Sequence, residues 1–267
     1  MLGNMKETLP KDVELQLEIQ RIVSNEEYFA SAKKEFEREM KTDYGLDFVV
    51  DPEVFPPFYF DASIRMAQRL ALNFLENTNI KNILAIGIGS GIDFVPLITT
   101  CTDQSAKIPN LYGTEINPKA IQNTQNNFDF LDSRLKLFQT DILLDINVKY
   151  DLTCWNIPFF GQSVESYGID QGAENHFLGS RFDQNYKSLN SNLKQLRYKL
   201  HRDGKLILMF SEFGKDRIEN IILENGFEIC DQESFTVTKC IRQPLPEHLH
   251  FEVFVGVYTP FNETSKY

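Results

Sequence analysis

The chain has 267 residues, of which 42% are hydrophobic and 24% are charged, the ordinary composition of a folded globular protein. Its length allows one large α/β domain, or one domain with a small additional segment. The formal net charge is −11, and the chain lacks the long basic runs that replace counterions along a nucleic-acid backbone. The composition therefore argues against a protein that holds long DNA or folded RNA.

Four cysteines are widely spaced and include no C-x-x-C pair: Cys101, Cys154, Cys230 and Cys240. This spacing indicates neither a zinc site nor a redox motif, so we expect no bound metal and reduced thiols that are mostly buried. The N-terminal residues lack the apolar core of a signal peptide. No apolar run approaches the roughly 20 residues of a membrane span. We therefore expect a cytoplasmic protein with no membrane partner.

The first part of the chain is predicted to form a small segment of its own. Residues 11–41 have the apolar spacing of helices. Residues 44–60 contain three prolines, which prevent a continuous helix and predict a short extended hairpin or strap. Asp61 then caps the next helix. These signals divide the chain into N-terminal helices with a strap, residues 1–60, and a main domain, residues 61–267.

From residue 81 onward, strands and helices alternate. Apolar runs predict seven strands, at residues 82–86, 111–114, 135–139, 150–155, 205–210, 227–238 and 250–258. Helical patterns separate most of these strands, so the prediction is an α/β fold with a doubly wound, mostly parallel, seven-stranded sheet. The last two strands have no long helix between them, which predicts an antiparallel strand at one edge.

Three alternating glycines follow the first strand: Gly87, Gly89 and Gly91, with Ser90 before the last. Glycine lets the backbone turn tightly and approach a ligand, and the following helix offers free N–H groups. A plain turn is the alternative interpretation. Dinucleotide enzymes require glycine at the sixth position of G-x-G-x-x-G, where this chain has Ile92. The G-x-G-x-G spacing is instead the one seen in S-adenosylmethionine sites.

Carboxylates follow the second and third strands. Glu115 comes where a carboxylate can accept both ribose hydroxyls of a nucleoside that lies over the glycine turn. The alternative for Glu115 is an acid that stabilises a helix dipole. Asp141 can accept a hydrogen bond from an adenine amino group while Ile142 packs against the ring; the alternative is a solvated loop acid. These three residues and the glycine turn are the predicted cofactor-binding residues.

The fourth strand is followed by Asn156-Ile157-Pro158-Phe159. This segment resembles the Asn/Asp-Pro-Pro-Tyr/Phe signature of the class I S-adenosylmethionine-dependent methyltransferases that act on planar nitrogen. Its Asn-Ile-Pro-Phe form is similar to that of the ribosomal RNA adenine dimethylases. The overall layout looks closer to the small N-methyltransferases, such as the release-factor glutamine methyltransferases, which carry N-terminal helices and a β-hairpin strap. The resemblance covers roughly residues 45–258.

The tetrapeptide has a chemical rationale, because an enzyme contributes mainly orientation to an in-line methyl transfer. The side-chain oxygen of Asn156 and the carbonyl of Ile157 would each accept one N–H of the target nitrogen. Phe159 would stack on a planar substrate, and Pro158 would fix the loop. A plain strand-ending turn is the alternative.

One position departs from the pattern that the resemblance implies. The family has an aspartate, which organises the methionine end of the cofactor, where this chain has Ala85. Asp93 is a candidate substitute. The polar loop 161–184 lies where the family builds its substrate lid, and its chemically capable members are His176 and Arg181, for which solvated loop residues are the alternative.

The leading hypothesis is therefore an S-adenosylmethionine-dependent N-methyltransferase whose acceptor is an amide or amine of a protein or small molecule. An RNA adenine N-methyltransferase is an alternative that the acidic charge disfavours. Two alternatives belong to other classes. An NAD-dependent oxidoreductase is opposed by Ile92 and the tetrapeptide, and a non-catalytic binding protein with this fold is supported by Ala85 alone. The sequence does not indicate an oligomeric state.

Overall fold

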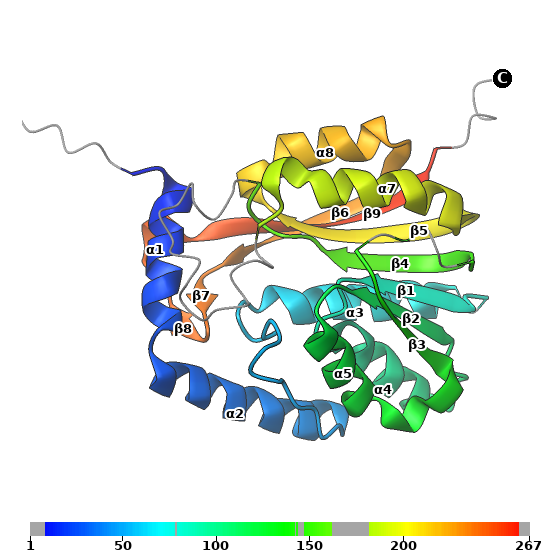
Figure 1. Ribbon diagram of the computed structural model, residues 1–267, viewed down its shortest axis with the longest axis horizontal. Helices are drawn as coiled ribbons and strands as arrows, with labels where there is room; N and C mark the ends of the chain where they lie inside the picture. The colour runs from blue at the N-terminus through cyan, green and yellow to red at the C-terminus, as the bar shows by residue number, and fades with distance from the viewer. Residues whose placement is uncertain (1–8, 78, 142, 144–146, 162–181, 262–267) are drawn as a thin grey trace, which may run out of the picture.

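The computed structural model describes residues 9–77, 79–141, 143, 147–161 and 182–261. It has one large sheet covered by helices on both faces, with two further helices near the N-terminus (Figure 1). The helices are α1 (Lys11–Val23), α2 (Glu26–Tyr44), α3 (Ala62–Glu76), α4 (Val95–Asp103), α5 (Pro118–Asn127), α7 (Lys187–Lys199) and α8 (Lys215–Glu224). The strands are β1 (Asn82–Ile86), β2 (Asn110–Glu115), β3 (Leu135–Gln139), β4 (Tyr150–Asn156), β5 (Leu200–Ser211), β6 (Phe227–Val237), β7 (Lys239–Cys240), β8 (Gln243–Pro244) and β9 (Phe251–Pro260).

The large sheet has seven strands in the order β3-β2-β1-β4-β5-β9-β6. Strands β1 to β5 pair with one another in parallel, whereas β9 is antiparallel to both β5 and β6. The predicted seven-stranded, mostly parallel, doubly wound sheet is therefore confirmed. The antiparallel strand is β9, which lies one position inside the edge strand β6. No helical crossover joins β6 to β9; the short β7–β8 pair connects them and returns the chain in the opposite direction.

Helices α3, α4 and α5 cover one face of the sheet, and α7 and α8 cover the other (Figure 1). A parallel sheet covered on both faces needs strands that are apolar on both sides, and β1 follows this rule. Ile83, Leu84 and Ala85 are all buried, although neighbouring side chains of a strand point to opposite faces.

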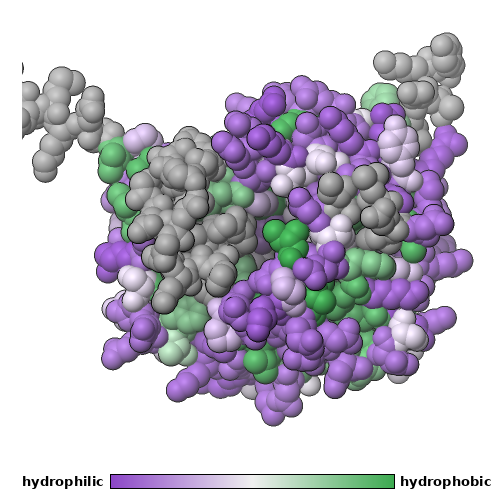
Figure 2. Space-filling model, in the orientation of Figure 1, coloured by the Kyte–Doolittle hydropathy of each residue, from purple (hydrophilic) through white to green (hydrophobic). Residues whose placement is uncertain are grey.

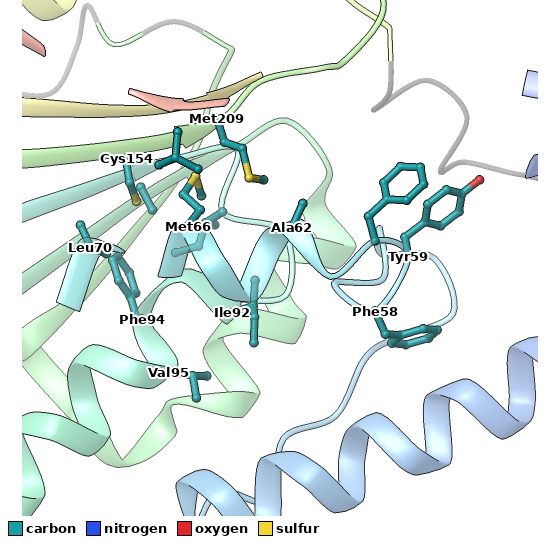
Figure 3. Close-up of a cluster of buried hydrophobic side chains, with 14 of the residues drawn as sticks. Phe58, Tyr59, Ala62, Met66, Leu70, Ile92, Phe94, Val95, Cys154 and Met209 are labelled. Atoms are coloured by element: carbon teal, nitrogen blue, oxygen red, sulfur yellow. The ribbon is translucent and has the colours of Figure 1, made fainter. Parts of the chain in front are cut away.

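Helix α3 packs its apolar stripe against the ends of the central strands. Met66 and Leu70 of α3 lie in one buried cluster with Cys154 of β4, Met209 of β5 and Phe94, which directly precedes α4 (Figure 3). Full burial of such a side chain contributes about 1.5–3 kcal/mol. This packing fixes the start of α3 beside the ends of β1 and β4.

Residues 45–61 join α2 to α3 and contain turns but no strand. Of the two forms expected for this segment, a hairpin or a strap, the chain adopts a strap. Asn117 donates a hydrogen bond to the carbonyl of Glu53 (2.8 Å), and Asn123 donates one to the carbonyl of Val49 (2.8 Å). These side chains, at the start of α5 and within it, satisfy backbone groups that have no sheet partner. They hold the strap against α5.

The predicted helices at residues 11–41 are present as α1 and α2. Asn25 caps α2 by accepting a hydrogen bond from the N–H of Tyr28 (3.1 Å). Apolar side chains of both helices, including Ile19 and Phe36, belong to the same buried cluster as the α3 side of the sheet. Within the described part of the chain, no helix is long and apolar enough to cross a membrane.

Candidate functional site

A cavity of about 370 Å³ lies at the carboxyl ends of β1, β2 and β4. Strand β1 has β2 on one side and β4 on the other, so the order of the strands reverses there. Doubly wound sheets bind ligands at such a switch point, and the volume is typical of small-molecule sites. Figure 2 shows apolar side chains near the centre of the molecule, between the hydrophilic surfaces over α7 and α5.

The structure brings most of the predicted site residues together. The cavity is lined by Gly87, Gly89, Ser90, Glu115, Asp141, Asn156, Ile157, Pro158 and Phe159. Gly91 does not line it but packs behind the glycine turn. Ile142, His176 and Arg181 lie outside the described residues. The cavity is also lined by Phe60, Asp93 and Trp155; Phe60 and Trp155 had not been predicted as site residues.

The glycine turn requires glycine for two different reasons. Gly87, Gly89 and Gly91 have φ values of 62°, 56° and 89°, in the left-handed region that favours glycine. At Gly89 a Cβ atom would meet nothing closer than 4.0 Å, so the turn presents open space there. At Gly91 a Cβ atom would lie 2.4 Å from a ring carbon of Phe128, so this glycine allows close packing against the end of α5.

The carboxylate of Glu115 holds the glycine turn to the connection between β2 and α5. One oxygen accepts a hydrogen bond from the N–H of Gly89 (3.1 Å), and the other accepts from the N–H groups of Ile116 (2.8 Å) and Asn117 (3.1 Å). A carboxylate has about four acceptor positions, so Glu115 keeps acceptor capacity for a ligand in the cavity. Glu115 thus shapes the turn and can also accept a hydrogen bond from a ligand hydroxyl group.

Asp141 lies at the rim of the cavity. The N–H of the preceding residue, Thr140, donates to the carbonyl of Glu115 (2.9 Å). Asn192 of α7 donates to the carbonyl of Asp141 (3.3 Å). These bonds position the backbone of Asp141, while its side chain is exposed.

Asn156 ends β4 and presents a free acceptor. Its side-chain oxygen is buried and accepts no hydrogen bond from the described residues. The next residue, Ile157, donates its N–H to the carbonyl of Met209 on β5 (3.1 Å), which fixes the backbone of the tetrapeptide. Buried acceptors are nearly always satisfied, so an unpaired one beside a cavity points to a ligand donor.

Phe159 belongs to an aromatic cluster that includes the strap. Its ring stacks on Phe60, with ring centroids 5.8 Å apart and an interplanar angle of 18°, and meets the edge of Phe251 at 6.1 Å. Ser211 donates a hydrogen bond to the carbonyl of Phe159 (2.8 Å). One face of the Phe159 ring is therefore covered by Phe60, which supplies a second ring to the cavity. The aromatic-rich stretch of the strap was the available sequence signal for Phe60.

Asp93 lies in the short 3-10 helix η1 (Ile92–Phe94) and is only 6% exposed. Asp93 is one of the residues that line the cavity. Burial raises the pKa of Asp93 to about 7, because the charged form loses its hydration. Burial, and then the nearby charge of Asp93, also raise the pKa of the Cys154 thiol well above its usual value.

Metal-binding residues do not cluster in the described ranges. No group of three or more His, Cys, Asp or Glu side chains there could hold an ion. The four cysteines form no disulfide with one another; three of them are buried, and Cys230 is exposed.

No profile of a known protein family matches the chain. A putative protein N5-glutamine methyltransferase from Methanocaldococcus jannaschii is 26% identical over 145 residues, which are 52% of this chain and 67% of that protein. The hMettl16 catalytic domain in complex with the MAT2A 3'UTR hairpin 1 has a TM-score of 0.56 at 14% identity, covering 92% of this chain and 91% of that chain. A putative RNA methyltransferase from Pyrococcus horikoshii has a TM-score of 0.54 at 15% identity, covering 86% of this chain and 100% of that chain. The chain thus has the fold of the class I S-adenosylmethionine-dependent methyltransferases and resembles a putative member of that class in sequence.

Proposed function

We propose that the chain is an S-adenosylmethionine-dependent methyltransferase that methylates a planar nitrogen, namely the side-chain amide of a protein. The observation that carries this proposal is the buried, unpaired side-chain oxygen of Asn156. Asn156 lines the same cavity as the glycine turn and Glu115, so an acceptor for a target N–H lies beside the groups that suit a nucleoside.

The lining residues fit the cofactor. Glu115 has acceptor capacity for ribose hydroxyls, and the open space at Gly89 allows a close approach to the backbone. The hydroxyl of Ser90 is buried and unpaired among the described residues, so it is available to a ligand. We assign Asp141 and Ile142 to the adenine. When bound, S-adenosylmethionine supplies a methyl group on a sulfonium.

The contribution of the protein to the reaction is orientation. An amide nitrogen is a poor nucleophile because its lone pair is delocalised. Hydrogen bonds from the target N–H groups to the Asn156 oxygen and the Ile157 carbonyl would hold the nitrogen in line with the methyl group. The stacked rings of Phe60 and Phe159 would keep water from the acceptor and cover its planar face.

Two observations support a protein acceptor. The net charge of −11 disfavours a phosphate backbone. The relative from Methanocaldococcus jannaschii carries the name of a putative protein glutamine methyltransferase. A second candidate, an RNA adenine N-methyltransferase, is favoured by the Asn-Ile-Pro-Phe form of residues 156–159, which resembles that of RNA adenine dimethylases.

The test is methyl transfer from S-adenosylmethionine carrying a tritiated methyl group to total cellular protein and, separately, to total RNA. We expect label in protein that complete proteolysis releases as N5-methylglutamine. Label released from RNA as N6-methyladenosine supports the second candidate instead. Absence of label in both samples, with no binding of S-adenosylhomocysteine by calorimetry, refutes a methyltransferase.

The Asn156→Ala variant separates binding of the cofactor from methyl transfer to the acceptor. It should bind S-adenosylhomocysteine almost as tightly as the wild type and lose methyl transfer, because the side chain acts on the acceptor. Asn126→Ala, at an exposed position of α5, is the matched control and should keep both properties. Full activity of Asn156→Ala on the labelled acceptor contradicts the proposed mechanism.

A further inference from the structure

We infer that Asp93 forms a cation-binding subsite of the cavity, which holds the ammonium group at the amino-acid end of S-adenosylmethionine. This inference rests on the proposed function. It assigns the binding role to Asp93 of η1, because β1 has Ala85 where the resemblance implies an aspartate. It starts from an acidic residue that is only 6% exposed and that is one of those lining the cavity.

Asp93 has no cation beside it in the described part of the chain. A buried carboxylate without a counter-charge is costly, so such a group either stays protonated or receives a cation from a ligand. Cys154 of β4 faces it with a thiol whose pKa is raised, and α3 contributes the uncharged Ala62 and Ser63 to the same cavity. A bound ligand would therefore have to supply the positive charge opposite the Asp93 carboxylate.

The other carboxylates of the cavity are already engaged or exposed. Glu115 accepts three backbone N–H groups, and Glu53 lies 3.3 Å from the ammonium of Lys119. The side chain of Asp141 is exposed at the rim. Asp93 is thus the buried acid that remains for a positively charged ligand group.

Asp93 lies near β4, which is on the other side of β1 from β2 and Glu115. Its charge acts on Cys154, and Cys154 is the strand neighbour of Ala85 in the register of β1 and β4. Asp93 therefore places a carboxyl near the end of β1, where Ala85 offers none. The unpaired hydroxyl of Ser90 lines the same cavity and can donate to the carboxylate of the same amino-acid group. A zwitterion needs this combination of one acceptor and one donor.

Two ligands with the same nucleoside test the inference. S-adenosylhomocysteine carries the amino-acid group, whereas 5′-deoxy-5′-methylthioadenosine ends in a thioether methyl and lacks that group. Calorimetric titration of each ligand would use the wild type, Asp93→Asn, and the control Asp151→Asn. Asp151 is a carboxylate near the start of β4, at the opposite end of this strand from the cavity, where it accepts hydrogen bonds from the N–H groups of Lys81 and Asn82. Thermal melting of each variant verifies that it is folded.

We expect Asp93→Asn to lower the affinity for S-adenosylhomocysteine by about 10-fold or more, the usual effect of losing a hydrogen bond between charged groups. The affinity for methylthioadenosine should change by less than about 2-fold. Asp151→Asn should leave both affinities unchanged. An equal loss for both ligands in Asp93→Asn, or no loss for either, overturns the inference. If the wild type binds neither ligand, the proposed function fails as well. Binding of both to the wild type with no selective loss in the variant refutes the role of Asp93 alone.

Discussion

Replacing Asp93 with asparagine should make the protein more stable at alkaline pH. The reason is the cost of burying the charge of Asp93. Folding takes this carboxyl almost completely out of water, and burial raises its pKa to about 7, from 3.8 in the unfolded chain. Asparagine has nearly the same shape and no charge to desolvate. The substitution therefore isolates the free energy that the ionised group costs.

The sign and the size follow from proton linkage. Between pH 4 and pH 7, the folded state keeps a proton on Asp93 that the unfolded state has released. The contribution of Asp93 to stability is therefore complete at acid pH, is lost as the pH rises, and is entirely lost above pH 7. A pKa difference of about three units corresponds to at most about 4 kcal/mol, and water in the cavity will reduce this value.

Urea unfolding of wild type and variant at pH 5, 6, 7 and 8 measures the effect. The gain in the free energy of unfolding of Asp93→Asn over the wild type should grow with pH and level off near pH 8. Titration of all other groups cancels in this difference, because both proteins contain them. A difference that is the same at every pH would show that the buried carboxylate carries no such cost.

Three other substitutions probe the glycine turn and the strap. Glu115→Ala should weaken the binding of S-adenosylhomocysteine, measured by calorimetry, by about 1–3 kcal/mol, because it removes both a hydrogen-bond acceptor for the ligand and the bond to the glycine turn; unchanged affinity would contradict its role. Gly91→Ala should lower the melting temperature more than Gly45→Ala, because both have positive φ but only the first places a Cβ against Phe128; equal effects would refute the packing argument. Asn123→Ala should destabilise the protein by about 1–3 kcal/mol and speed proteolysis within the strap, since it removes two hydrogen bonds, to the carbonyl of Val49 and from the N–H of Asp51; unchanged cleavage would count against the anchoring.

The fold could be predicted from local patterns. Each central strand is a short apolar run followed by glycine, proline or a polar residue, and these signals lie within a few residues of one another. The prediction of residues 135–139 as a strand agrees with β3. The β5 prediction was too short, because Leu200 is paired with Tyr150 across a register shift that no local pattern reveals.

The site could be predicted only where a residue directly follows a strand. Glu115 and Asn156 line the same cavity because the carboxyl ends of parallel strands lie at the same end of the sheet, which the alternation of strands and helices implies. The stacking of Phe60 on Phe159 joins residues about a hundred positions apart, and the burial of Asp93 depends on how η1 packs against α3. Such contacts depend on tertiary packing, so the sequence provided candidates for them but no geometry.

The strap is bound to α5 through its main chain, while its buried aromatic side chains pack into the core. The asparagines at the start of α5 and within it bond to backbone carbonyls and N–H groups of the strap, and these groups are the same whatever side chains the strap carries. Strap residues that are only partly buried can therefore be exchanged without loss of these anchors, and two of them, Glu53 and Phe55, line the cavity. At these positions the cavity is free to diverge between related proteins, or to be redesigned for a new acceptor, while the glycine turn and Glu115 stay as they are.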